Sequence, residues 1–356
     1  MGYLIIIAIF IQGFQLANIR LVGFKRKNNI LCTLLLVLII ISPLVYVAMN
    51  RSMDVGSDTF NVYYRIYYLG YTIFHWHTSW YEFLFVDLLK ICNFIVPNFQ
   101  FALGTIASII SVIYVYYFIK NKINLNIMLA LLGFFIWIWI PSLNISRQIL
   151  AVSILFLGIE FLKKDKINIF VVFWLISIFI HISAIIGGIY LILYYCKELD
   201  SKKIPIMFSL GSVIGLLLVN LIIKIPIFSK FQTQLGSFTI SNINFKFFLL
   251  PLMILPFIVL NWDKISKEKY GYILLTSYLL IFPSILLSGY MWFAFRIMYF
   301  FIPSEIILIA RIGKYYESSI SRALVNLILI ILLIGSFYLY YVVWHVDGVV
   351  PYQFYN

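Results

Sequence analysis

The chain has 356 residues, of which 63% are hydrophobic and 11% charged, and its formal net charge is +13. This composition excludes a soluble globular protein, because no fold of this length could hide so much apolar surface. Apolar runs of about 17–25 residues, each able to cross about 30 Å of hydrocarbon, recur along the chain. We therefore predict an all-α, polytopic integral membrane protein with a single transmembrane domain over residues 1–356.

In so apolar a chain, the positive charge indicates cytoplasmic loops beside anionic lipid headgroups rather than a nucleic-acid partner. Basic loops stay in the cytoplasm, so six of them orient the predicted spans: 18–29, 120–126, 163–168, 197–203, 263–269 and 311–322. Between two such loops the chain must go out and return, which predicts about twelve spans with both termini outside. In chain order the spans are 3–17, 31–48, 99–119, 127–142, 148–162, two short helices within 168–195, 206–223, 245–260, 271–289, 291–310 and 323–343.

The segments between these spans predict where the protein works. Residues 80–96 are amphipathic, and the alternation of inward and outward spans does not allow this segment to cross the membrane. We therefore expect an interfacial or re-entrant helix. Residues 49–79 and 224–244 are predicted to be external and to face the substrate. The unusual polar side chains then all fall on the external side, whereas the cytoplasmic loops are short and carry no motif.

Arg147 follows Asn144 in the external turn between two predicted spans. If Asn144 caps the second helix, Arg147 and Gln148 share one face of its first turn. The positive end of the helix and a guanidinium then make a site for phosphate. The alternative is an interfacial arginine that reaches lipid headgroups.

Asp58 lies in the external sequence Arg51-Ser-Met-Asp-Val-Gly-Ser-Asp-Thr59, where Gly56 allows a tight turn. Its carboxylate could accept the hydrogen bond or the proton of a sugar hydroxyl, or it could cap the next helix. Arg65 follows a few residues later.

His181 is predicted at the external tip of the hairpin within residues 168–195. A lone histidine in an apolar run is either a satisfied structural residue or, at the depth of Arg147, a general base. Arg296 is predicted about one and a half turns into the descending helix 291–310, too deep for its guanidinium simply to reach the headgroups. No set of His, Cys, Asp or Glu suggests a metal site.

Several short motifs follow one another along the chain: an Arg before Gly-Ser-Asp-Thr59, Trp80-Tyr-Glu-Phe83, Ser142-Leu-Asn-Ile-Ser-Arg-Gln148, His181-Ile-Ser-Ala184 and Arg296-Ile-Met-Tyr299. In this order they resemble the EpsG group of Wzy-type bacterial polysaccharide polymerases, over roughly residues 40–300. Phe83 departs from the pattern, since proline is expected there after Glu82.

The resemblance implies an enzyme of the bacterial plasma membrane with its active site facing outside. Such polymerases join undecaprenyl-pyrophosphate-linked oligosaccharide repeat units at the outer leaflet. The implied architecture is similar to the GT-C-type, metal-independent glycosyltransferases that use lipid-phosphate donors. No cofactor is implied, and membrane lipid, a flippase and a chain-length regulator of the same pathway are the implied partners.

Roles follow for the candidate residues if the reaction is inverting glycosyl transfer with lipid pyrophosphate as the leaving group. The predicted catalytic residues are His181 and Asp58, either of which could be the base. The predicted pyrophosphate ligands are Arg147, Arg296 and Arg51. The residues predicted to bind or orient sugar are Asn144, Gln148, Arg65 and Glu82.

Two other functions are compatible with the sequence. A flippase or transporter of lipid-linked oligosaccharide also needs buried arginines and about twelve spans, but it favours internal symmetry and polar groups on both faces. A membrane acyltransferase that modifies surface glycan favours a catalytic histidine near a cytoplasmic acyl donor, whereas His181 is predicted outside.

Overall fold

The apolar runs fold as helices because a segment in hydrocarbon must satisfy its own backbone N–H and C=O groups. The structure, a computed structural model, describes residues 30–69, 82–218, 238–291 and 293–355. Over those ranges the regular structure is helical, with one isolated bridge between Arg51 and Phe354. The predicted all-α fold is confirmed.

Among the described residues, three helical segments are long and apolar enough to cross a membrane. They are α6 (Phe99–Lys120), α17 (Gly271–Leu286) with its extension to Gly289, and α19 (Ser319–Phe337) with its extension to Val343. Shorter apolar helices occupy Thr33–Met49, Ile127–Ser142, Ile167–Ile180, Ile204–Leu217 and Phe245–Leu260. The number of twelve spans therefore stays a prediction.

The predicted span 3–17 lies outside the described residues, as do 219–223 of the span 206–223 and residues 70–79 and 224–237 of the two external segments. Where the helices are described, their ends mostly match. Helix α2 (Ile30–Met49) corresponds to the span 31–48, and α6 to the span 99–119. Asn98 stops α6 from extending further back, because its side chain accepts a hydrogen bond from the Gln100 N–H at 2.8 Å.

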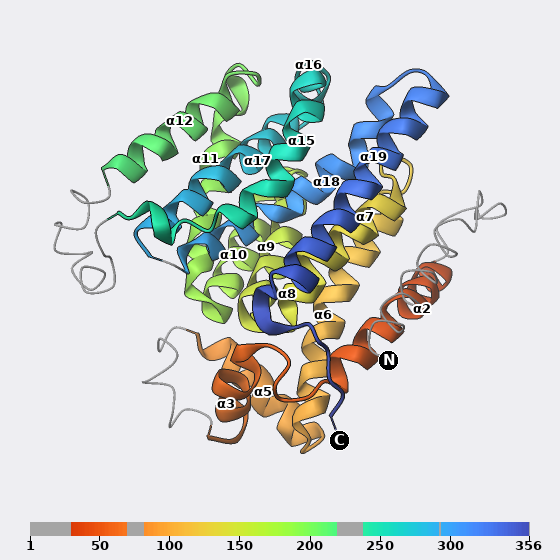
Figure 1. Ribbon diagram of the computed structural model, residues 1–356, viewed down its shortest axis with the longest axis vertical. Helices are drawn as coiled ribbons and strands as arrows, with labels where there is room; N and C mark the ends of the chain where they lie inside the picture. The colour runs from red at the N-terminus through yellow and green to blue at the C-terminus, as the bar shows by residue number, and fades with distance from the viewer. Residues whose placement is uncertain (1–29, 70–81, 219–237, 292, 356) are drawn as a thin grey trace. The chain divides into compact units, whose positions relative to one another are not determined.

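The chain forms two compact units, and the first comprises residues 1–185 and 333–356. In this unit α2 packs along α6, and α9 (Ser146–Leu162) packs along α10 (Ile167–Ile180) (Figure 1). Helix α7 (Ile127–Phe134) continues through the π-helical turn η3 (Phe135–Trp139) into the short α8 (Ile140–Ser142). The predicted span 127–142 is thus one continuous helical segment.

The amphipathic segment of the first unit forms α5 (Phe83–Ile95). One face of α5 buries Phe85 and Leu89, whereas Phe94 and Ile95 are exposed. Two short helical turns, η1 (Thr59–Tyr64) and α3 (Arg65–Leu69), precede α5 in the chain, and α3 packs against α5. The amphipathic helix is confirmed, and its position in the membrane interface stays a prediction.

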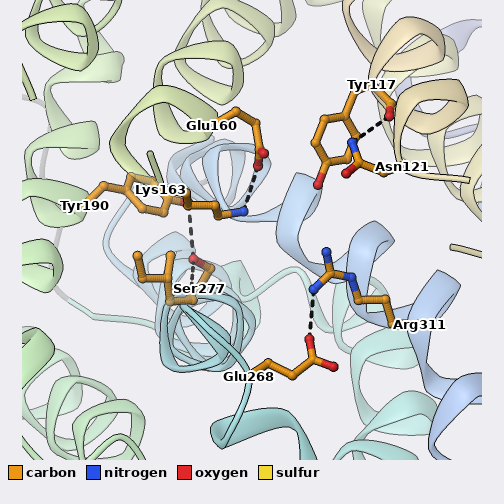
Figure 2. Close-up of polar contacts among 9 residues, drawn as sticks. Tyr117, Asn121, Glu160, Lys163, Tyr190, Glu268, Ser277 and Arg311 are labelled. Atoms are coloured by element: carbon orange, nitrogen blue, oxygen red, sulfur yellow. Dashed lines mark hydrogen bonds and ion pairs between the residues drawn. The ribbon is translucent and has the colours of Figure 1, made fainter. Parts of the chain in front are cut away.

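The second unit comprises residues 186–332. Its described α-helices are α11 (Gly188–Tyr195), α12 (Ile204–Leu217), α15 (Leu249–Leu260), α16 (Trp262–Ser266), α17, α18 (Ile302–Ile312) and the part of α19 up to Leu332. Helix α17 is the core of this unit, since it packs against α12 and α18 and buries nearly all of its side chains. The Tyr190 hydroxyl of α11 lies in this core, where it donates to the Phe300 carbonyl at 3.0 Å and contacts Ser277 Oγ at 3.3 Å (Figure 2).

One end of the second unit is held by Glu268, which precedes α17. Its carboxylate pairs with Arg311 at 3.1 Å (Figure 2) and with Lys314 at 2.5 Å. Tyr315 donates a hydrogen bond to the same carboxylate at 2.9 Å. The start of α17 and the end of α18 therefore lie together, which agrees with the predicted antiparallel course of these two segments.

The predicted continuous helix 291–310 is wrong. The structure has a 3-10 turn, η10 (Ala294–Phe300), followed by α18 from Ile302, so Arg296 is not within an α-helix. Pro303 gives the physical reason. A proline ring clashes with the carbonyl four residues earlier and has no N–H, so Pro303 suits the first turn of α18 and disfavours an α-helix that continues through it.

Candidate active site

Glu82 brings together three distant segments of the first unit. Its carboxylate lies 2.9 Å from Arg147 Nη1 and 2.5 Å from His181 Nδ1. The backbone N–H of Ile182 also donates to it, at 2.9 Å. The Glu82 side chain is only 3% exposed, against 15% for Arg147 and 20% for His181. The acid is therefore hidden behind the two basic groups, which remain accessible.

Local backbone structure produces this arrangement. Helix α10 ends at Ile180, and His181 is extended with φ −154° and ψ 120°. This break frees the Ile182 N–H to donate to Glu82 instead of to a helical carbonyl. Arg147 lies in the first turn of α9, and Glu82 directly precedes α5. Helix α5 begins at Phe83, where the resemblance led us to expect proline, and the centre of the Phe83 ring lies 5.1 Å from that of Phe179.

Glu82 stays ionised in this environment. Burial, the largest single influence, would raise the pKa of its carboxyl. The hydrogen bond with His181 and the positive charge of Arg147 outweigh that effect, with help from the Ile182 N–H, and the pKa lies below its usual value. Since a carboxylate can only accept hydrogen bonds, His181 Nδ1 must carry a proton, and a neutral ring then has its lone pair on Nε2.

Asn144 organises a second cluster in the same unit. Its Oδ1 accepts from the Asp58 N–H at 3.0 Å and from Ser57 Oγ at 3.3 Å. The expected role as helix cap is wrong, because Ile145 occupies the N-cap position of α9 and the Asn144 side chain is used by the loop of Asp58. A tertiary partner has replaced the local one.

Gly56 allows the two segments of this cluster to approach. It has φ +80°, and a Cβ at this position would lie 2.6 Å from the Leu143 carbonyl oxygen. The Thr59 hydroxyl contacts the same carbonyl at 3.2 Å. The Gly-Ser-Asp-Thr loop is thus fitted to the turn that carries Asn144, and a side chain at residue 56 would separate them.

Tyr63 links the two clusters. It lies in η1 after Asp58, and its hydroxyl accepts a hydrogen bond from the Arg147 N–H at 3.4 Å. Its ring makes an edge contact with Phe85 of α5 at 5.5 Å. Among many tyrosines in this loop, nothing in the sequence singles out Tyr63.

Arg51 is buried beside the start of α9. The residue is 2% exposed, and Nη2 contacts Ser146 Oγ at 3.5 Å. Burial lowers the pKa of the Arg51 guanidinium to about 10. The structure therefore places Arg51 against the turn that precedes Arg147, and its contact with a pyrophosphate stays a prediction.

The other predicted site residues are less closely connected. Gln148 is buried on α9. Arg65 is exposed at the start of α3, with its guanidinium 6.0 Å from the centre of the Phe60 ring. Arg296 belongs to the second unit and is half-buried in η10, so joint binding of a ligand with Arg147 stays a prediction. Tyr299 of the same motif is buried.

Across the described ranges, no group of three or more His, Cys, Asp and Glu side chains is arranged to hold a metal ion. Around Glu82 the fold gathers one carboxylate, one imidazole and one guanidinium. Such a set can move a proton and stabilise negative charge.

The helices and this site define a helical membrane protein that carries an acid–histidine–arginine cluster in its first unit. The chain matches the EpsG family over residues 5–354, nearly its whole length, and belongs to that family. Membership supports a role in polysaccharide biosynthesis. No curated protein and no solved structure matches the chain.

Proposed function

We propose that this protein is a polymerase of undecaprenyl-pyrophosphate-linked oligosaccharide repeat units, active at the outer leaflet of the bacterial plasma membrane. The observation that carries the proposal is the bridge that Glu82 makes between His181 and Arg147. The family membership supports the same class of reaction. The predicted topology supports the outward-facing position, because it assigns all three residues to the external side.

The bridge suits the acceptor half of a glycosyl transfer. His181 Nε2 takes the proton of an acceptor hydroxyl as its oxygen forms a bond to the anomeric carbon of the donor sugar. The resulting imidazolium is stabilised by the Glu82 carboxylate at Nδ1. This assigns the base to His181 and leaves Asp58 to orient the acceptor, its loop being held through Asn144.

The same bridge suits the donor half. As the bond from the anomeric carbon to the pyrophosphate oxygen breaks, its electron pair goes to the lipid pyrophosphate. Arg147 pairs with Glu82 through Nη1, and a guanidinium has further N–H donors for phosphate oxygens. Arg296 is proposed as a second donor to that group. Direct displacement inverts the anomeric centre, and no metal ion is required.

The first test uses purified protein in lipid nanodiscs with a lipid-linked repeat unit. We expect His181→Ala to lower the rate of chain lengthening about 10²–10⁴-fold, the usual contribution of a general base. Asp58→Asn should cost less, since it keeps the side chain that can orient the acceptor. The opposite ranking of these two variants would transfer the role of base to Asp58.

A matched control comes from the other end of α9. Glu160 pairs with Lys163 at 2.7 Å, an acid–base contact on the same helix as Arg147 (Figure 2). Glu160→Gln should leave chain lengthening unchanged within about twofold, as expected for a partly exposed ion pair. If Glu160→Gln and His181→Ala behave alike, the proposed site is wrong.

The second test separates polymerase from flippase. The gene is deleted in the native host and the surface glycan is separated by gel electrophoresis. Loss of long polymer with survival of single repeat units supports the polymerase, whereas loss of all surface glycan supports the flippase. Unchanged chain length with altered acyl substitution would instead support an acyltransferase.

A further inference from the structure

The segment after α19 returns to the loop that carries Asp58, within the first unit. Its backbone is tied to that loop at three places by hydrogen bonds: Tyr355 N–H to Asn50 O at 2.8 Å, Ser52 N–H to Gln353 O at 2.9 Å, and Gly56 N–H to Gly348 O at 3.2 Å. The Tyr352 hydroxyl also donates to the carbonyl of Val47. Residues 345–355 therefore form a clasp on the segment 47–56, far along the chain from every motif of the candidate site.

The side chain of Asp347, within this clasp, contacts Asn144. Its Oδ1 accepts a hydrogen bond from Asn144 Nδ2 at 3.0 Å. Its backbone is left-handed, with φ 64° and ψ 0°. A residue other than glycine costs about 1–2 kcal/mol in that conformation and persists only where its surroundings impose it. The contact thus depends on a backbone conformation that the clasp maintains.

The contact decides which way the Asn144 amide points. A carboxylate only accepts hydrogen bonds, so Asn144 must turn its NH2 group toward Asp347. Its Oδ1 then faces the Asp58 N–H and Ser57 Oγ, both of which it accepts from. A reversed amide would place NH2 against the Asp58 N–H and Oδ1 against the Asp347 carboxylate, and would lose both of these hydrogen bonds. Asn144 is 2% exposed, so water cannot replace them easily.

We propose that Asp347 is a positioning residue: by fixing the amide of Asn144 it holds the loop of Asp58 against the turn that leads to Arg147. The inference rests on the proposed function, because it assigns Asp347 to the same glycosyl transfer. Asp347 acts through Asn144 and does not touch the substrate. The path continues to Arg147, whose N–H donates to Tyr63 of the same loop.

The activity test uses three variants at residue 347 and its partner. Asp347→Ala removes the acceptor, and we expect kcat for chain lengthening to fall about 10-fold, the effect of one buried hydrogen bond. Asp347→Asn can still turn its Oδ1 to Asn144, so it should stay within about threefold of wild type. Asn144→Asp opposes two carboxylates and should lose activity, and the swap Asn144→Asp/Asp347→Asn should recover most of it.

A control matches the backbone strain. Asp165 is the other described aspartate with a positive φ, at +59°, and it follows α9 at the opposite end from Arg147. Asp165→Ala should leave kcat unchanged. An equal loss in Asp165→Ala and Asp347→Ala would show that general stability, and not positioning, explains the effect.

A second readout needs no activity. Hydrogen–deuterium exchange of residues 52–60 in nanodisc-embedded protein should rise in Asp347→Ala and return to wild-type values in the swapped pair. If Asp347→Ala keeps wild-type exchange and wild-type kcat while His181→Ala is inactive, the positioning role of Asp347 is wrong and the proposed function stands. A fully active His181→Ala would overturn the proposed function, and the exchange result would still decide whether Asp347 holds the loop.

Discussion

Glu82 and Glu268 are both carboxylates that bridge two basic side chains, yet their surroundings differ. Glu268 pairs with Arg311 and Lys314 and accepts from Tyr315, and its side chain is 23% exposed. Glu82 is 3% exposed and has an imidazole among its partners. An acid between permanent cations ties helix ends together, whereas a buried acid bonded to a histidine can also prepare a base. The residues that contact a buried carboxylate, and not the carboxylate itself, therefore decide whether it can take part in proton transfer.

The two clusters should differ most when the negative charge of their glutamate is removed. Glu82→Gln keeps the size of the side chain but cannot stabilise an imidazolium, so we expect a loss in kcat of about 10²-fold or more. Glu268→Gln should keep chain lengthening within about twofold and should lower the melting temperature instead, because it breaks an ion-pair network. Equal losses of activity in the two variants would remove the distinction between the clusters.

The arginines give the next largest effect. Arg147→Lys keeps the charge but loses the planar fork that binds two phosphate oxygens, so the rate should fall about 10–100-fold, with a weaker response to lipid pyrophosphate added as product inhibitor. Arg311→Lys should retain wild-type kinetics. Unaltered product inhibition in Arg147→Lys would assign this guanidinium to structure.

Each glutamate cluster has a tyrosine beside it, and removing its hydroxyl should have a smaller effect. Tyr63→Phe removes the acceptor for the Arg147 N–H, and we expect a loss in kcat of about 2–5-fold. Tyr315→Phe removes the donor to Glu268, and it should change the melting temperature without changing kcat. Paired kinetic and thermal-unfolding measurements check both. A kinetic effect confined to Tyr315→Phe would contradict the assignment.

The smallest expected effect is on stability in acid. The pKa of Glu82 is lowered in the folded protein, so its contribution to stability is complete above the unfolded pKa of about 4.3 and is lost as the pH falls through the folded value. The melting temperature of wild type should therefore fall more steeply below about pH 5 than that of Glu82→Gln. Parallel curves would show that Glu82 is not stabilised by His181 and Arg147.

Much of the helical structure was predictable, because hydropathy and capping act locally. The ends of α2 and α6 agree with the apolar runs to within one residue, and the break at His181 lies at the predicted tip. The prediction failed for the segment containing Arg296, where Pro303 weighed more than continuous hydropathy. It failed for Asn144 as a helix cap because the loop of Asp58 offered a competing partner.

The sequence alone determined that this chain is helical and has the composition of a membrane protein, and its motifs made Glu82, Arg147 and His181 candidates for the site. Composition, periodicity and family motifs can all be read without the fold. Only the tertiary structure decided that Glu82 joins the other two, from 99 residues away in the case of His181, and that Asp347 reaches Asn144 from the far end of the chain. The physical reason is that a buried charge is stable only beside a partner of opposite charge or a hydrogen-bonding group. Tertiary packing decides which residue that partner is, so no local sequence pattern predicts it.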